Sequence, residues 1–168
     1  FIMQFSHTLS SNTFYTIGAS WFERGVKYRL HDLTYEPATD GSGDLVEVVN
    51  AGGPRYVHPK LFLTDDPYSF LTGGTDMGRF QRSTTTKLVK LDLSSQLDNA
   101  NLVKIGAEYR VHNVFYENIT LQPVAEQSDI NLATASPFIR TRILPLSSLY
   151  HDMYNRSPKE ISAYIQDK

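Results

Sequence analysis

One stretch of this chain restricts its fold more than any other. Residues 87–116, KLVKLDLSSQLDNANLVKIGAEYRVHNVFY, alternate apolar and polar side chains on both sides of a short polar segment. Alternation with period two predicts two antiparallel strands joined by a tight turn, in a sheet with one apolar and one polar face. That apolar face meets either a protein core or a lipid bilayer. Its residues are Val89, Leu91 and Leu93 in the first strand and Val103, Ile105, Ala107, Tyr109 and Val111 in the second.

Composition leaves both environments open. The chain has 168 residues, 40% of them hydrophobic, which is enough to bury a core. A net charge of -2 indicates no nucleic-acid partner, because such proteins carry clustered Lys and Arg. With no cysteine there is neither a disulfide framework nor a thiolate metal site. No apolar run is long enough for a transmembrane helix, but a membrane strand needs about ten alternating residues.

Alternation elsewhere extends the strand prediction along the chain. A first hairpin turns at residues 10–13, and Phe14 and Trp21 lie about 23 Å apart in its second arm, the spacing of the aromatic girdles of a membrane barrel. Short apolar runs at Leu45–Val49 and Lys60–Leu63 suggest a small hairpin, and Ser147–Tyr154 a short helix. The predicted strands are about 1–9, 14–26, 84–95, 102–116 and 160–168, with long loops at about 27–83 and 117–159.

Short turns and long loops alternate strictly between these strands. Outer-membrane barrels have this asymmetry, because their periplasmic turns are short and their outer loops are long. We therefore expect an all-β fold of antiparallel transmembrane β-barrel strands, a partial barrel with long extracellular loops. Residues 1–168 are expected to be one fragment of a longer barrel domain, because about five strands cannot close a barrel.

Residues with catalytic or metal-binding chemistry are scattered. The five histidines form no closely spaced pair, and nucleophile, phosphate-loop and dinucleotide motifs are absent. The DGSGD run at residues 40–44 lacks the later Glu of a calcium loop and indicates a glycine-rich turn. We therefore expect no catalytic residue, no metal and no cofactor. Asp65, Asp66 and Asp76 lie near aromatic residues as in a glycosidase or sugar site, but the favoured interpretation is a surface loop whose acids cap turns.

Several strand sequences resemble a known family. FSHTLSSNTFYTIGASWFERG, LVKLDLSSQLDNANLVKIGAEYRVHNV and PKEISAYIQDK are similar to barrel strands of TonB-dependent outer-membrane receptors of the Bacteroidetes type, which carry a carboxypeptidase-like regulatory domain. The matching positions are His7–Phe14, Lys90–His112 and Ser162–Lys168, and the likeness covers about half of the chain. The resemblance implies nutrient uptake across the outer membrane of a Gram-negative cell, without catalysis. It also implies three partners, which are TonB, the lipid bilayer and the rest of the receptor chain with its plug.

In a barrel of this kind the two strand faces have different surroundings. The substrate is unknown, and candidate ligand contacts lie in the first loop. The residues expected to face lipid are Tyr15, Ile17, Trp21, Val89, Leu91, Val103, Ile105 and Tyr109. Those expected to face the lumen are Lys90, Lys104, Glu108, Arg110 and His112, and the candidate loop contacts are Tyr68, Phe70, Arg79 and Phe80.

Two other functions fit the same residues. A soluble β-rich module that binds carbohydrate would pack the apolar faces together as a sandwich. An enzyme with its site in the first loop would need the loop carboxylates to converge in a cleft.

Overall fold

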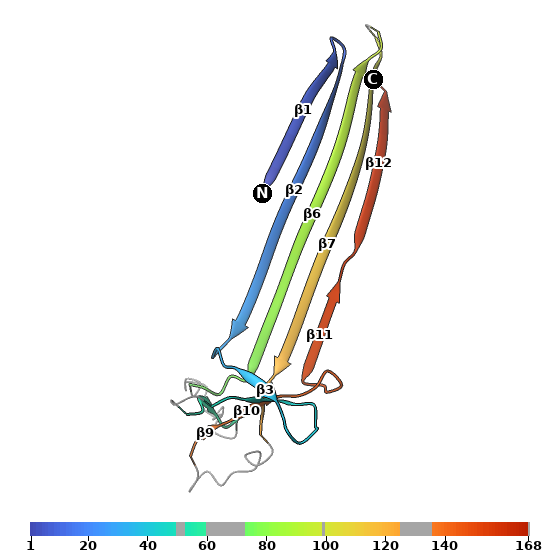
Figure 1. Ribbon diagram of the computed structural model, residues 1–168. Coiled ribbons are helices and arrows are strands. Elements are labelled where there is room, and N and C mark those ends of the chain that lie inside the picture. The colour runs from blue at the N-terminus through green and yellow to red at the C-terminus, as the bar shows by residue number, and fades with distance from the viewer. Residues whose placement is uncertain (50–52, 60–72, 99, 125–135, 168) are drawn as a thin grey trace, which may run out of the picture. The chain divides into compact units, whose positions relative to one another are not determined.

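All regular elements of the described chain are β-strands (Figure 1). The computed structural model describes residues 1–49, 53–59, 73–98, 100–124 and 136–167. The predicted all-β class with antiparallel pairing is confirmed, and the described strands do not close into a barrel. Within these ranges no helix has the length and apolar character needed to cross a membrane. The chain divides into two compact units. Unit 1 comprises Phe1–Gly25, Arg82–Phe115 and Tyr154–Lys168, and unit 2 comprises Val26–Gln81 and Tyr116–Met153.

Unit 1 is built on one antiparallel sheet in the order β1-β2-β6-β7, with β11 and β12 both paired to β7. β1 ends and β2 begins at the same end of this sheet at which β6 ends and β7 begins (Figure 1). The strands are β1 Ile2–Ser10, β2 Thr13–Arg29, β6 Gly78–Gln96, β7 Leu102–Thr120, β11 His151–Arg156 and β12 Lys159–Asp167.

Strand bounds differ from the prediction where the alternation is weak. β2, β6 and β7 continue several residues into the segments predicted as loops. The short helix suggested for Ser147–Tyr154 is wrong, because residues from His151 onward form β11. HDMYNR has no apolar alternation, so its strand conformation depends on the neighbouring β7 ladder rather than on its own sequence. The carbonyl of Pro158 accepts a hydrogen bond from the His112 amide at 3.0 Å, which continues this pairing between β11 and β12.

Backbone register gives the sheet of unit 1 two chemically different faces. Phe5 pairs with Ile17 and His7 with Tyr15, whereas the intervening Ser6 pairs with Thr16. Paired residues of antiparallel strands point to the same face, so the apolar positions of both strands align. The pairs of β12 and β7 repeat this arrangement. Ile161–Tyr109, Ala163–Ala107 and Ile165–Ile105 share the apolar face, and Glu160–Arg110, Ser162–Glu108, Tyr164–Gly106 and Gln166–Lys104 share the polar face.

Unit 2 has a hydrophobic core of its own. Its residues come from segments that the sequence predicted as loops, and each is at most 8% exposed. The small strands around it form two sheets, β3-β4-β10-β8 and β5-β9. They are β3 Tyr35–Pro37, β4 Leu45–Glu47, β5 Tyr56–Val57, β8 Gln122–Pro123, β9 Phe138–Ile139 and β10 Thr141–Ile143. The core residues are Tyr56, Met77, Ile119, Leu121, Ile139 and Ile143.

The first arm of the small hairpin predicted in the first loop pairs with other strands than expected. Residues 45–47 form β4, which pairs with β3 and with β10. The other predicted arm, 60–63, lies outside the described residues.

A buried carboxylate of unit 2, that of Glu47, has hydrogen-bond partners. The Glu47 carboxylate is 1% exposed, and its Oε2 accepts hydrogen bonds from the amide and the hydroxyl of Thr141, each at 2.8 Å. The Tyr35 hydroxyl lies 2.8 Å from Oγ1 of Thr141. A short hydrogen-bond network therefore joins the side chains of Tyr35, Thr141 and Glu47. Such pairing offsets the cost of burying a carboxylate and fixes how β4 and β10 meet.

The DGSGD run forms the glycine-rich turn that was predicted. Gly41 and Gly43 have φ values of 75° and 78°, in the left-handed region that glycine adopts without strain. The carboxylate of Asp40 accepts hydrogen bonds from the hydroxyl of Ser42 at 2.6 Å and from its amide at 3.0 Å. These bonds lower the pKa of Asp40, so the turn is held by an ionised carboxylate.

Tyr56 makes the stability of unit 2 sensitive to alkali. Burial raises the pKa of its phenol from 10.0 to about 12. Because the folded state favours the neutral phenol, this stability is complete below pH 10 and is lost as the pH rises through 12. We expect a loss of about 2 kcal/mol across that range. Circular dichroism of the Tyr56→Phe variant should show a smaller alkaline loss, and an unchanged profile would contradict this assignment.

Candidate functional site

The residues predicted to face lipid share one exposed face of unit 1. Ile17, Trp21, Val89, Leu91, Ile105 and Tyr109 are between 42% and 53% exposed, and Tyr15 and Val103 are half-buried. The ammonium of Lys87 lies 5.3 Å from the Trp21 ring centroid, which places the odd-numbered residues of β6 beside those of β2. The apolar positions of the strands therefore form one continuous surface, which we call the apolar face.

The opposite face carries the residues predicted to line a lumen, and most of them have ion-pair or hydrogen-bond partners on that face. Arg110 pairs with Glu108 on its own strand and with Glu160 of β12, the latter at 3.3 Å. Nδ1 of His112 lies 2.9 Å from the Thr86 hydroxyl, and its Nε2 lies 3.5 Å from the Glu160 carboxylate. A second cluster contains Lys90, whose ammonium is 3.1 Å from Asp92. The register places Lys104 on this same face, opposite Gln166.

Tyr164 is a residue of the polar face that the sequence analysis did not single out. Its ring lies across Gly106 of β7, and its hydroxyl donates a 2.7 Å hydrogen bond to Asp92 of β6. A Cβ atom at Gly106 would be 2.1 Å from the nearest ring carbon of Tyr164. The glycine therefore lets one side chain join three strands. A glycine in the middle of a regular alternating strand is the sequence signal for such a close approach.

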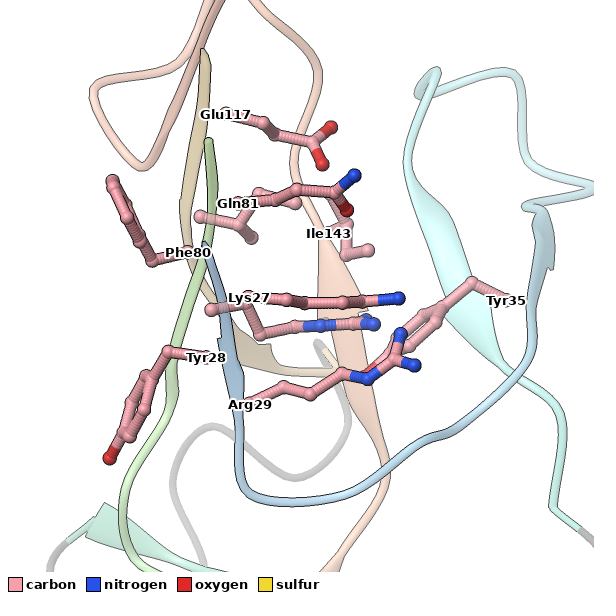
Figure 2. A pocket seen from close by; sticks show the side chains of 10 residues that line it. Lys27, Tyr28, Arg29, Tyr35, Phe80, Gln81, Glu117 and Ile143 are labelled. Carbon is pink, nitrogen blue, oxygen red and sulfur yellow. The ribbon is translucent and has the colours of Figure 1, made fainter. Parts of the chain in front are cut away.

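Unit 2 contains a cavity of about 200 Å³ with three cationic side chains, which we call the basic pocket. Figure 2 shows Lys27, Arg29, Gln81 and Glu117 extending to one side of their strands, with Tyr28 and Phe80 on the other. This follows from strand geometry, because alternate residues point to opposite faces. The lining residues are Lys27, Tyr28, Arg29, Tyr35, Arg79, Phe80, Gln81, Glu117, Ile119 and Ile143.

Positive charge exceeds negative charge in the lining of the basic pocket. Three cations, Lys27, Arg29 and Arg79, line it together with one carboxylate, Glu117. Arg29 pairs with Asp32, whose side chain is 73% exposed. Nε2 of His151 lies 3.5 Å from the Glu117 carboxylate. The pocket is therefore suited to a ligand that carries negative charge.

Tyr35 forms a neutral wall of the basic pocket. The guanidinium carbon of Arg79 lies 5.1 Å from the centroid of its ring, in a cation–π contact. Burial raises the pKa of the Tyr35 phenol, so the hydroxyl stays protonated. With its ring covered by Arg79, Tyr35 is not a free stacking platform for a sugar.

The loop residues proposed as ligand contacts do not all lie at one site. Arg79 and Phe80 both line the basic pocket, and the Phe80 ring packs edge-on against Tyr116 with the centroids 5.6 Å apart. Asp76 accepts hydrogen bonds from the Tyr28 hydroxyl and the Gly78 amide, as a turn residue does. Tyr68, Phe70, Asp65 and Asp66 lie outside the described residues.

Within the described ranges, no three His, Asp or Glu residues are arranged to hold a metal ion.

Comparisons with known proteins identify no relative. The chain matches no family model, no curated protein and no solved structure.

Proposed function

We propose that this chain is part of the barrel wall of a TonB-dependent receptor that takes up a nutrient across the outer membrane of a Gram-negative cell. The observation that carries the proposal is the pair of faces of unit 1. Large apolar side chains are exposed on one face, and a network of charged residues occupies the other. In this proposal the apolar face meets lipid, the polar face meets the lumen or the plug, and the chain performs no catalysis.

Exposed apolar area supports this proposal. Patches of this kind on a water-soluble surface mark an interaction site or cause aggregation, whereas in a barrel they are the lipid contact. The contact between Lys87 and Trp21 also suits a membrane boundary, where aromatic rings and the long stems of lysines place polar ends in the headgroup layer.

The proposal requires more protein than this chain. Backbone groups in a bilayer have to be hydrogen-bonded, and the open sheet of unit 1 leaves outer edges on β1 and β12. Further strands of the same receptor would pair with these edges and close the barrel. The family resemblance adds a plug inside the barrel and TonB as the energy-transmitting partner. The soluble carbohydrate-binding module remains the competing function.

Spin labels along β7 would test the proposed faces directly. The chain has no cysteine, so single substitutions at positions 103–111 introduce one new thiol each in this segment. In the full-length receptor in lipid vesicles, labels at Val103, Ile105 and Tyr109 should be relaxed mainly by oxygen. Labels at Lys104, Glu108 and Arg110 should be relaxed mainly by a water-soluble nickel complex.

The accessibility profile separates the competing functions. Low access of both reagents at the apolar positions would indicate a soluble sandwich core and would contradict the membrane proposal. High access of the nickel complex at every position would also contradict it, because the whole strand would then be in water. The receptor without introduced cysteines gives the background from thiols elsewhere in the protein.

A further inference from the structure

We infer that the basic pocket of unit 2 binds a phosphate group, carried either by a lipid headgroup or by a free phosphate ion. The inference goes beyond the receptor function, which specifies neither this site nor any ligand chemistry. It depends on the geometry of unit 2 alone and holds whether or not unit 1 meets lipid.

The cations of the pocket have the chemistry that phosphate binding needs. Arg29 and Arg79 each present a planar guanidinium, whose parallel N–H groups match two oxygens of a phosphate. Lys27 adds a point charge, and no ion-pair partner for it is found among the described residues. Gln81 supplies a further polar group at the wall, whereas the Tyr35 hydroxyl is hydrogen-bonded to Thr141. A dianion would therefore meet both charge and hydrogen-bond donors.

The size of the pocket favours a small anionic group over a whole nutrient molecule. Cavities that enclose drug-sized ligands measure about 300–1,000 Å³. The basic pocket, at about 200 Å³, has room for about seven water molecules. A phosphate group fits this space, with the remainder of its carrier outside. Ile119 and Ile143 line the pocket and are 5% and 6% exposed, so part of its wall is apolar.

A titration with two arms distinguishes the two sources of phosphate. The full-length protein in detergent is titrated by calorimetry with inorganic phosphate in one arm and with solubilised lipid A bisphosphate in the other. Lipid A without its phosphates is the control ligand. Binding in the first arm indicates a free-ion site. Binding only of phosphorylated lipid A indicates a headgroup site, and no binding in either arm overturns the inference.

Variants test whether binding uses this pocket. Lys27→Gln removes one exposed cation and should weaken binding about tenfold or more, because a charge-assisted contact is lost. Lys27→Arg keeps the charge and should bind within a few-fold of the parent protein. Arg55→Gln removes an equal charge from an exposed position of unit 2 that does not line the pocket. Equal losses from Lys27→Gln and Arg55→Gln, or no loss from Lys27→Gln, would overturn the inference.

Discussion

Ile105→Arg is expected to destabilise the folded receptor in a membrane by about 2 kcal/mol, because a cationic side chain on the lipid-facing surface of a barrel wall costs between about 4 kcal/mol at the midplane and about 1 kcal/mol near the interface. Ile105 is 45% exposed on the apolar face and pairs with Ile165 of β12. In water, a charge at such an exposed position changes stability by about 0.5 kcal/mol or less. The size of the effect therefore reports which solvent this face meets.

Ser162→Arg is the matched control for this substitution. Ser162 lies on the neighbouring strand, on the polar face, where it pairs with Glu108. An arginine there remains in a charged environment and should be tolerated. Urea unfolding of the full-length protein in lipid vesicles measures both variants, with Ile105→Leu as the control for shape. Equal stability of Ile105→Arg and Ser162→Arg would contradict a lipid-facing Ile105.

Sequence alternation was sufficient to predict the two faces of unit 1. Side chains of a strand alternate strictly, so knowing that residues 103–111 form a strand already separates Ile105 from Lys104. The same reasoning could not predict the partners across strands. Arg110 meets Glu160 because β12 pairs with β7 in one particular register, and nothing in either strand alone specifies it.

The core of unit 2 was not predictable from local patterns. Tyr56, Leu121 and Ile139 are apolar residues in segments without any period, and they meet only after distant parts of the chain come together. β11 was missed for a related reason, because its pairing with β7 compensates for its weak strand pattern. Short irregular segments obtain their conformation from tertiary contacts, which a sequence pattern does not contain.

The basic pocket was predicted only in part. Arg79 was a candidate ligand contact, but Lys27 and Arg29 lie just beyond the predicted end of their strand at about residue 26. Had the strand been predicted to continue to Arg29, its alternation would have placed the side chains of Lys27 and Arg29 on the same face. Their meeting with Arg79 and Tyr35 depends on strand pairing and on the small sheet of unit 2.

Gly106→Val is expected to disrupt the contact that joins the three strands. The first added carbon would lie 2.1 Å from the Tyr164 ring and 2.7 Å from the Asp92 carboxylate. Neither atom can stay in place at such distances, so the ring has to leave β7 and its hydrogen bond to Asp92 is lost. Overpacking of this kind costs roughly 3 kcal/mol. Because β12 provides the displaced ring, its pairing with β7 should weaken most.

Hydrogen exchange of β12 in the full-length protein measures this effect locally. Amides of residues 159–167 should exchange at least about tenfold faster in Gly106→Val, since 1.4 kcal/mol already corresponds to a factor of ten. Ala107→Val adds bulk to the adjacent residue, on the apolar face, and should leave β12 protected. In a Tyr164→Ala background the ring is absent, so Gly106→Val should cost much less. If its cost is the same in both backgrounds, the Tyr164 ring is not the group that requires glycine at position 106.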